Sequence, residues 1–179
     1  QYQEYKAAGT EYDALAGIAH KETGEGDPGQ SSIGAGGDDG PDDDEPYQCP
    51  IDFDALQEIN PDVVGWIVVD GTTIDYPVVQ GPDNAVYLNT TFNGAANASG
   101  AIFMDYRNTP DFSNTNTIIY GHKMRNNTMF QGLSEYKSQD FWQEHPAFTI
   151  YTPDAGYRCE VFAAYVTQPV SETYVLDFE

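Results

Sequence analysis

The sequence predicts a mixed, mainly β domain, a β-barrel carrying a few peripheral helices. Short runs of β-branched and aromatic residues recur between residues 63 and 167, and turn residues separate them. Asp70 and Gly71 join two of these runs, which is a strong hairpin signal. A hydrophobic content of 40% and an aromatic content of 13% supply enough apolar surface for a packed core.

Composition divides the chain into three segments. Residues 1–23 predict a short helix whose apolar positions are Tyr5, Tyr12, Leu15 and Ile18. Residues 24–46 consist mainly of Gly, Pro and Asp. Because such a segment cannot offset its ordering entropy by burial, we predict a flexible acidic linker there. Residues 47–179 form the predicted folded domain.

The predicted elements of that domain begin with a helix after Asp52, a suitable N-cap, and Pro61 ends this helix. Its apolar face would hold Phe53, Leu56 and Ile59. The stretch VVGWIVVDGTTIDYPVVQG follows as the hairpin, and PDNAVYLN predicts a short helical turn.

The next stretches, GAIFMDYRN and NTIIYGH, predict two strands. The second is mostly apolar, so we expect it to be a central strand. TMFQGLSEY predicts a helix with Met129, Leu133 and Tyr136 on one face. AFTIYTPDAGYRCEVFAAYVT predicts two final strands around a Pro-Asp-Ala-Gly turn.

The net charge of −22 excludes some classes of partner. Nucleic-acid binding depends on Lys and Arg that release counterions, and docking to anionic lipid needs the same residues. The chain has 29 acidic residues against 7 basic ones, so we expect neither. No run of 18 apolar residues is present to span a membrane.

His122 is the most notable candidate for chemistry. It ends the buried-type run TIIYGH, and Gly121 before it permits a close approach of backbone or ligand. A histidine held at a strand end can serve as an acid or base, although the local pattern alone favours a purely structural role. The spacing of the three histidines and two cysteines matches no metal motif, so we predict no metal site and no cofactor.

The two cysteines allow different interpretations. Cys159 alternates with Val161, Ala163 and Tyr165, which predicts a small buried side chain with an unreactive thiol. Cys49 follows the acidic linker. In an oxidising compartment, a disulfide between Cys49 and Cys159 is an alternative to two free thiols.

Taken in order, the motifs INPDVVGWIVVDGTTIDYPVVQGPDNAVYL, GAIFMDYRN, NTIIYGHKM, TMFQGL and EHPAFTIYTPD resemble the class B sortases. The resemblance covers residues 51–178. It implies a closed β-barrel with peripheral helices and a membrane-anchored cysteine transpeptidase on the outer face of a Gram-positive bacterium. Such an enzyme cuts a C-terminal sorting signal through a Cys thioacyl intermediate. It then joins the protein to an amine of a peptidoglycan precursor or pilin.

The same resemblance assigns roles to four residues. His122, from the YGH motif, takes the place of the catalytic acid–base histidine. Tyr120, Asn84 and Leu88 fall where related enzymes line the groove for the sorting signal. The resemblance also implies a single N-terminal membrane anchor, which these residues do not include.

The sequence departs from the family at its end. The family's nucleophilic cysteine lies in a T-L-[ST]-T-C strand downstream of the histidine, with an arginine on the next strand, and neither motif is present. We do not transfer the nucleophile to Cys159, nor the arginine to Arg107 or Arg158. We therefore expect a barrel without its last strands that is inactive by itself, either as a fragment of a longer sortase or as an inactive relative.

Two other functions compete with this interpretation. A sortase-like surface module could bind peptides in the same groove without catalysis. The acidic run of residues 42–45 suggests calcium binding, although it lacks the spacing of a calcium loop.

Overall fold

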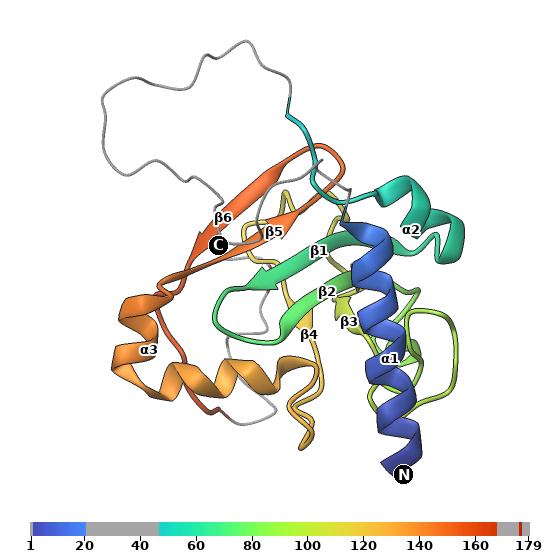
Figure 1. Ribbon diagram of the computed structural model, residues 1–179. Coiled ribbons are helices and arrows are strands. Elements are labelled where there is room, and N and C mark those ends of the chain that lie inside the picture. The colour runs from blue at the N-terminus through green and yellow to red at the C-terminus, as the bar shows by residue number, and fades with distance from the viewer. Residues whose placement is uncertain (1, 21–46, 168–175, 177–179) are drawn as a thin grey trace, which may run out of the picture.

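A computed structural model describes residues 2–20, 47–167 and 176 of the chain. Its described strands form one six-stranded sheet in the order β4-β3-β2-β1-β5-β6, flanked by the long helix α1 and several short helices (Figure 1). The elements, in chain order, are α1 (Tyr2–Ala19), α2 (Phe53–Ile59), β1 (Val63–Val69), β2 (Ile74–Val79), the 3-10 helix η1 (Val86–Leu88), β3 (Ile102–Met104), β4 (Ile119–Tyr120), the 3-10 helix η2 (Phe130–Lys137), α3 (Gln139–Glu144), β5 (Ala147–Tyr151) and β6 (Gly156–Glu160). The predicted linker, residues 24–46, lies outside the described residues.

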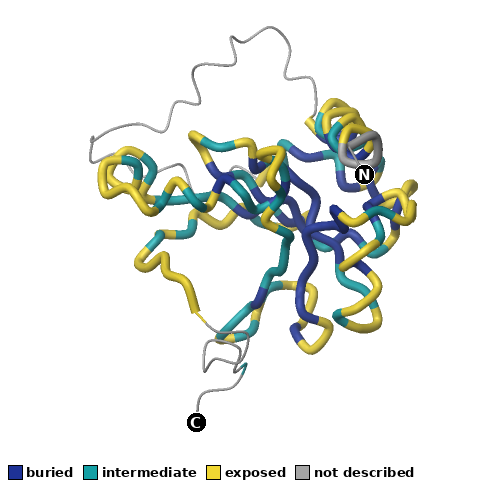
Figure 2. The backbone as a smooth tube through the Cα atoms, turned by 90° about the horizontal axis from the view of Figure 1, so that it is seen from below, coloured by how far each residue is buried: buried dark blue, intermediate teal, exposed yellow. Residues whose placement is uncertain are grey.

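The predicted hairpin is confirmed as β1 and β2. The strands pair antiparallel from Val63 with Val79 to Val69 with Ile74. Gly71 adopts a φ of +76° in the connection, a conformation that glycine reaches without steric cost. Burial is nearly continuous along both strands, and Figure 2 shows the buried backbone gathered at the centre of the molecule.

The N-terminal helix is also present, but one of its predicted apolar positions is wrong. Tyr12 and Leu15 are buried, whereas Ile18 is 47% exposed and Ala19 is buried instead. Tyr12 and Ala19 are seven residues apart, which is about two helical turns, so they lie on the same face of α1. This face contacts α2 and strand β2 of the sheet. Tyr12 also donates a hydrogen bond of 2.9 Å to the carbonyl of Gly100.

Helix α2 begins as predicted. Asp52 is its N-cap, and the Asp52 carboxylate accepts a hydrogen bond of 3.1 Å from the Ala55 amide. Phe53 and Leu56 are buried, but Ile59 is 41% exposed because it lies in the last turn, past the end of the packed face.

The expected central strand around residues 116–122 is wrong. Strand β4 contains two paired residues, Ile119 and Tyr120, and lies at an edge of the described sheet. The two middle strands of the sheet are β2 and β1. Strand β3 is fully buried and lies between them and the edge, pairing parallel with β2 and antiparallel with β4. The apolar run at residues 117–120 therefore indicates partial burial of these side chains, and it does not indicate a central strand of the sheet.

The predicted helix over residues 128–136 is a 3-10 helix. Met129 is buried, as expected, but Leu133 is 41% exposed. A 3-10 helix repeats every three residues, so the face chosen with α-helical spacing rotates away from the core. Helix α3 was not predicted; the Ser138 hydroxyl caps it by accepting from the Phe141 amide.

The last two strands, β5 and β6, form the expected hairpin, with Cys159 opposite Phe148. The predicted alternation beyond Cys159 is wrong, because β6 ends at Glu160 and the side chains of Ala163 and Tyr165 are exposed. Both cysteines are free thiols, so no Cys49–Cys159 disulfide is present.

The described strands form a curled half-barrel. Its two edges are β4 and β6, so the predicted closure is not made by these strands. Within residues 2–20, 47–167 and 176, no helix has the length and apolarity needed to cross a membrane.

Candidate active site

His122 lies just past β4, where the chain leaves the sheet. Its main-chain oxygen accepts a hydrogen bond of 2.9 Å from the Phe130 amide, which ties it to the start of η2. Gly121 precedes it in tight contact with the side chains of Ile102 and Phe130, and a Cβ at this position would overlap both. The glycine in the YGH motif thus serves close packing.

The imidazole of His122 is half-buried and contacts the last residue of η1. Its Nε2 atom is 2.7 Å from the main-chain oxygen of Leu88. A carbonyl oxygen accepts but does not donate, so Nε2 carries the hydrogen. In the neutral ring, Nδ1 then keeps its lone pair. A ring held in this way can accept a proton at Nδ1 and give it back.

The Leu88 carbonyl is itself held by its surroundings. The Asp83 carboxylate accepts hydrogen bonds from the amides of Ala85 and Val86 at the start of η1, at 2.8 and 3.0 Å. These two bonds lower the pKa of Asp83. At the other end, Gly100 has a φ of +58° and packs directly against the carbonyl of Leu88.

Asp105 organises the second half of the site, and sequence analysis missed it. It follows β3 directly and is 0% exposed. Its Oδ2 atom accepts from the Asn84 amide at 2.9 Å, from the Tyr120 hydroxyl at 2.8 Å and from Nη2 of Arg107 at 2.8 Å. The available signal was an acidic residue immediately after a three-residue run of buried types, because a buried carboxylate requires partners.

The other carboxylate oxygen of Asp105 completes a forked pair with Arg107. Its Oδ1 atom accepts from Nε of Arg107 at 2.9 Å and from the Arg107 main-chain amide at 3.0 Å. The guanidinium beside it is the main cause that holds the pKa of Asp105 well below its usual range; the hydroxyl of Tyr120 and the amide of Asn84 act in the same direction. Asp105 is therefore ionised at any physiological pH.

Asn84 and Tyr120 are each held by a further contact. The Asn84 side-chain oxygen accepts a hydrogen bond of 3.0 Å from the Tyr106 amide. The Tyr120 ring packs against Phe103, with ring centres 5.1 Å apart. Both side chains thus have defined positions before any ligand is present.

The four residues predicted for the site form two contacting groups. His122 bonds to Leu88, and Asn84 and Tyr120 meet at Asp105. Two short segments supply all four, residues 84–88 around η1 and residues 120–122 at the end of β4. The structure thus places the predicted residues together, and it adds Asp105 and Arg107.

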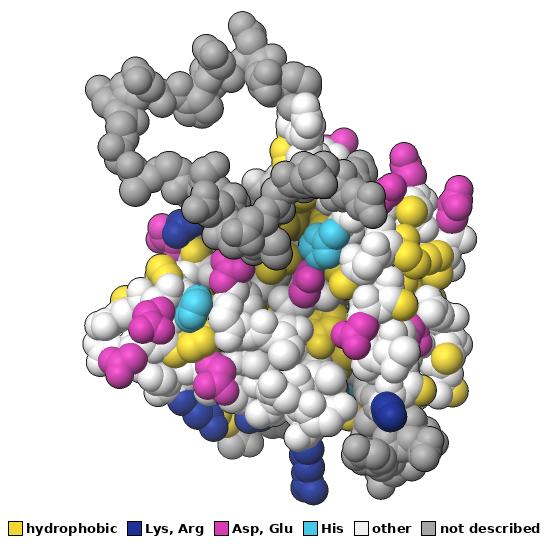
Figure 3. Space-filling view, in the orientation of Figure 1, with side chains coloured by type: hydrophobic (Ala, Val, Ile, Leu, Met, Phe, Trp, Pro, Cys, Tyr) yellow, Lys and Arg dark blue, Asp and Glu magenta, His cyan; other side chains and the backbone are white. Residues whose placement is uncertain are grey.

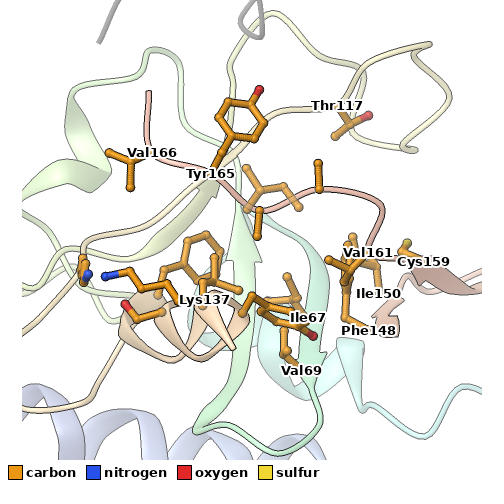
Figure 4. A pocket seen from close by; sticks show the side chains of 18 of the residues that line it. Ile67, Val69, Thr117, Lys137, Phe148, Ile150, Cys159, Val161, Tyr165 and Val166 are labelled. Carbon is orange, nitrogen blue, oxygen red and sulfur yellow. The ribbon is translucent and has the colours of Figure 1, made fainter. Parts of the chain in front are cut away.

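A hollow with a volume of about 880 Å³ lies apart from these four residues. Apolar side chains of β1, β5 and β6, including Ile67, Phe148 and Cys159, line it together with η2 and the segment after β6 (Figure 4). None of the four predicted site residues lines this hollow, although Ile119 of the adjoining β4 does.

Cys159 faces this hollow rather than His122. Burial raises the pKa of its thiol, which disfavours the reactive thiolate. Its sulfur is 3.8 Å from the carbonyl of Tyr157 in its own strand. The thiol is thus in a protonated, unreactive setting.

Charge is spread thinly over the visible surface. Figure 3 shows acidic side chains scattered over the face in view, with few basic ones between them. Among the residues with described positions, no group of three or more His, Cys, Asp or Glu side chains comes together as a metal site.

Comparison with known proteins agrees with the motif series. The family model of the sortase domain matches residues 67–178. Sortase B of Listeria monocytogenes is 41% identical over 124 residues, which are 69% of this chain and 50% of that protein. Sortase B of Staphylococcus aureus is 42% identical over 127 residues, or 71% of this chain and 52% of that protein.

Solved structures give the same result. The structure of sortase B from B. anthracis in complex with AAEK1 superposes with a TM-score of 0.79 at 33% identity, covering 99% of this chain and 75% of that one. The Staphylococcus aureus sortase B–substrate complex gives a TM-score of 0.68 at 42% identity, covering 71% and 59%.

The chain spans about half the length of the curated relatives it matches. The family match nevertheless covers the end of β1, all of β2 to β6 and the two segments that hold residues 84–88 and 120–122. The chain belongs to the sortase family, and its relatives place it among the class B sortases.

Proposed function

We propose that the protein to which this chain belongs is a class B sortase, a cysteine transpeptidase. It cleaves the C-terminal sorting signal of a secreted protein and transfers the new carboxyl end to an amine. The observation that carries the proposal is the convergence of His122, Leu88, Asn84 and Tyr120 in a chain of this family.

His122 performs the proton transfers of the reaction. A cysteine thiolate attacks the scissile carbonyl carbon, and the C–N bond breaks as His122 gives a proton to the departing amine. An incoming amine then attacks the thioester and loses a proton to His122, while the C–S bond breaks and the thiolate returns. The Leu88 carbonyl keeps the imidazole in one orientation during both steps.

The nucleophile of this mechanism is neither Cys49 nor Cys159. The proposed nucleophile belongs to the family's T-L-[ST]-T-C motif, and the proposed oxyanion arginine follows that motif; the 179 residues contain neither. Cys159 lines the apolar hollow with its thiol pKa raised, which supports leaving it out of the chemistry.

The groove for the sorting signal is formed in this chain by Asn84, Leu88 and Tyr120. A relative, sortase B of Staphylococcus aureus, has been solved as a substrate complex, which supports peptide binding by this fold. The amine acceptor is a peptidoglycan precursor or a pilin. The relatives come from Gram-positive bacteria, so we place the enzyme on the outer face of the membrane, held by an N-terminal anchor.

The test uses the full-length protein with a peptide that carries a candidate sorting signal. Mass spectrometry should detect an acyl-enzyme, and adding an amine such as triglycine should convert it to a transpeptidation product. The His122→Ala variant should give neither. Peptide binding without any acyl-enzyme would show a non-catalytic sortase-like module instead.

A further inference from the structure

We propose that Asp105 and Arg107 are positioning residues for the sorting-signal groove. They act by holding Asn84 and Tyr120, and this inference rests on the proposed function. The ion pair lies behind the groove residues and joins two segments, residues 84–88 and 120–122, that no strand pairing connects.

The carboxylate of Asp105 has the geometry for this role. Its Oδ2 atom receives three donors from Asn84, Tyr120 and Arg107, all at 2.8–2.9 Å. The Oδ1 atom receives two more, both from Arg107. Five donors around one fully buried carboxylate fix its orientation, and they fix the side chains that donate to it.

Arg107 makes the buried charge tolerable. An isolated carboxylate in a protein interior carries a large desolvation penalty, which a paired and hydrogen-bonded one largely avoids. The Arg107 side chain is 45% exposed, so its guanidinium reaches the ion pair from the surface side. Its planar fork matches both carboxylate oxygens, which a lysine ammonium cannot do.

The hydrogen bonds to Asp105 restrict the side chains of Asn84 and Tyr120, and this restriction determines the shape of the groove. The Asn84 amide is committed at both ends, to Asp105 and to the Tyr106 amide. The Tyr120 hydroxyl proton is committed to Asp105. Asn84 and Tyr120 therefore present a preset arrangement to a peptide, and preset side chains avoid an entropic cost on binding.

An isosteric change separates positioning from simple packing. Asp105→Asn keeps the volume of the side chain but replaces one acceptor oxygen by an NH₂ group. This group is a donor, and it would face the donors of Arg107, or those of Asn84 and Tyr120. In the full-length protein, we expect KM for a sorting-signal peptide to rise about tenfold, while kcat changes less than about threefold. Arg107→Lys keeps the charge without the fork and should give a smaller rise in KM.

The control is Asp75→Asn. Asp75 also holds two side chains, accepting from Trp66 Nε1 and bonding to His20, but it lies on β2 away from the groove residues. This variant should lose stability without a change in KM.

A double-mutant cycle tests the route of action. In an Asn84→Ala/Tyr120→Phe background, Asp105→Asn should change peptide Kd by less than about twofold, because its targets are already gone. Kd is measured in His122→Ala protein, so that turnover does not interfere. A full, additive effect in this background would show that Asp105 acts by another route, and the inference would be overturned.

A second readout needs no substrate. The side-chain amide protons of Asn84 should exchange slowly in NMR spectra of the wild-type protein and quickly in Asp105→Asn and Arg107→Lys. Unchanged exchange, or wild-type KM in folded variants of Asp105 and Arg107, overturns the inference and leaves the proposed function standing. A wild-type protein that neither binds nor cleaves any sorting-signal peptide overturns the proposed function, and the inference with it.

Discussion

The Nε2 atom of His122 lies 2.7 Å from the main-chain oxygen of Leu88, 34 residues earlier in the chain. The contact joins the end of β4 to the end of η1 and sets which imidazole nitrogen carries the hydrogen in the neutral ring. It also places the candidate acid–base residue beside a residue of the proposed groove.

Replacement of His122 by alanine should abolish transpeptidation in the full-length protein. General acid–base catalysis typically contributes about 10²–10⁴-fold, so kcat/KM should fall by at least that range. The melting temperature should change little, since the ring is half-buried and makes its hydrogen bond to Leu88, an exposed residue at the end of η1. His145→Ala, which removes a ring packed at a tilt against Phe141, is the matched control and should keep its activity. Retained turnover in His122→Ala would remove the acid–base role.

Gly121→Ala should destabilise the fold. An added methyl group would overlap the side chains of Ile102 and Phe130, and overpacking of this kind costs about 1–3 kcal/mol. Urea unfolding measures the loss. Gly17→Ala is the control, because no atom lies within 4 Å of a Cβ there. Its helical position should make that variant more stable by up to about 1 kcal/mol. Equal stability of the two variants would contradict the packing assigned to Gly121.

The ion pair between Asp105 and Arg107 should make the free energy of unfolding depend on pH in acid. Arg107 lowers the pKa of Asp105 in the folded state, whereas an unfolded aspartate has a pKa of about 3.9. The unfolded chain then binds more protons in acid. The stabilisation is thus complete above about pH 5 and is lost progressively as the pH falls toward the folded pKa. The free energy of unfolding, measured from pH 3 to pH 7, should therefore fall less steeply in Asp105→Asn. Parallel curves would show that this carboxyl is not perturbed.

Cys159→Ala should leave catalysis nearly unchanged. The thiol faces the apolar hollow, and burial raises its pKa, so iodoacetamide should alkylate it more slowly at pH 7 than a free cysteine. Peptide cleavage and alkylation rates check the two parts. Lost activity in a folded Cys159→Ala protein would assign this residue a role in the reaction.

Local chemistry made several features predictable from the sequence. Asp70 and Gly71 predicted the β1–β2 hairpin, and Asp52 predicted the cap of α2, because turn and cap preferences depend on a few adjacent residues. The series of motifs around His122 predicted the family, since several distinct motifs occur in the order that the family has.

Tertiary contacts decided the features that the sequence left open or predicted wrongly. Strand β4 lies at an edge of the described sheet although its residues are apolar. Ile119 and Tyr120 are only half-buried there, and the Tyr120 ring packs on Phe103 of its one neighbouring strand, β3. Ala19 replaces Ile18 on the buried face of α1, since the register of a helix depends on the surface it meets.

Patterns along the chain were enough to predict a mainly β domain of the sortase family with His122 as its acid–base candidate. The groups that surround this histidine follow from the folded arrangement. Asp105 came to hold Asn84 and Tyr120, and Leu88 came to hold His122, through contacts across 15 to 34 residues. The physical reason is that a buried carboxylate and a main-chain carbonyl take their partners from whichever donors the fold brings near, and no local pattern encodes that proximity.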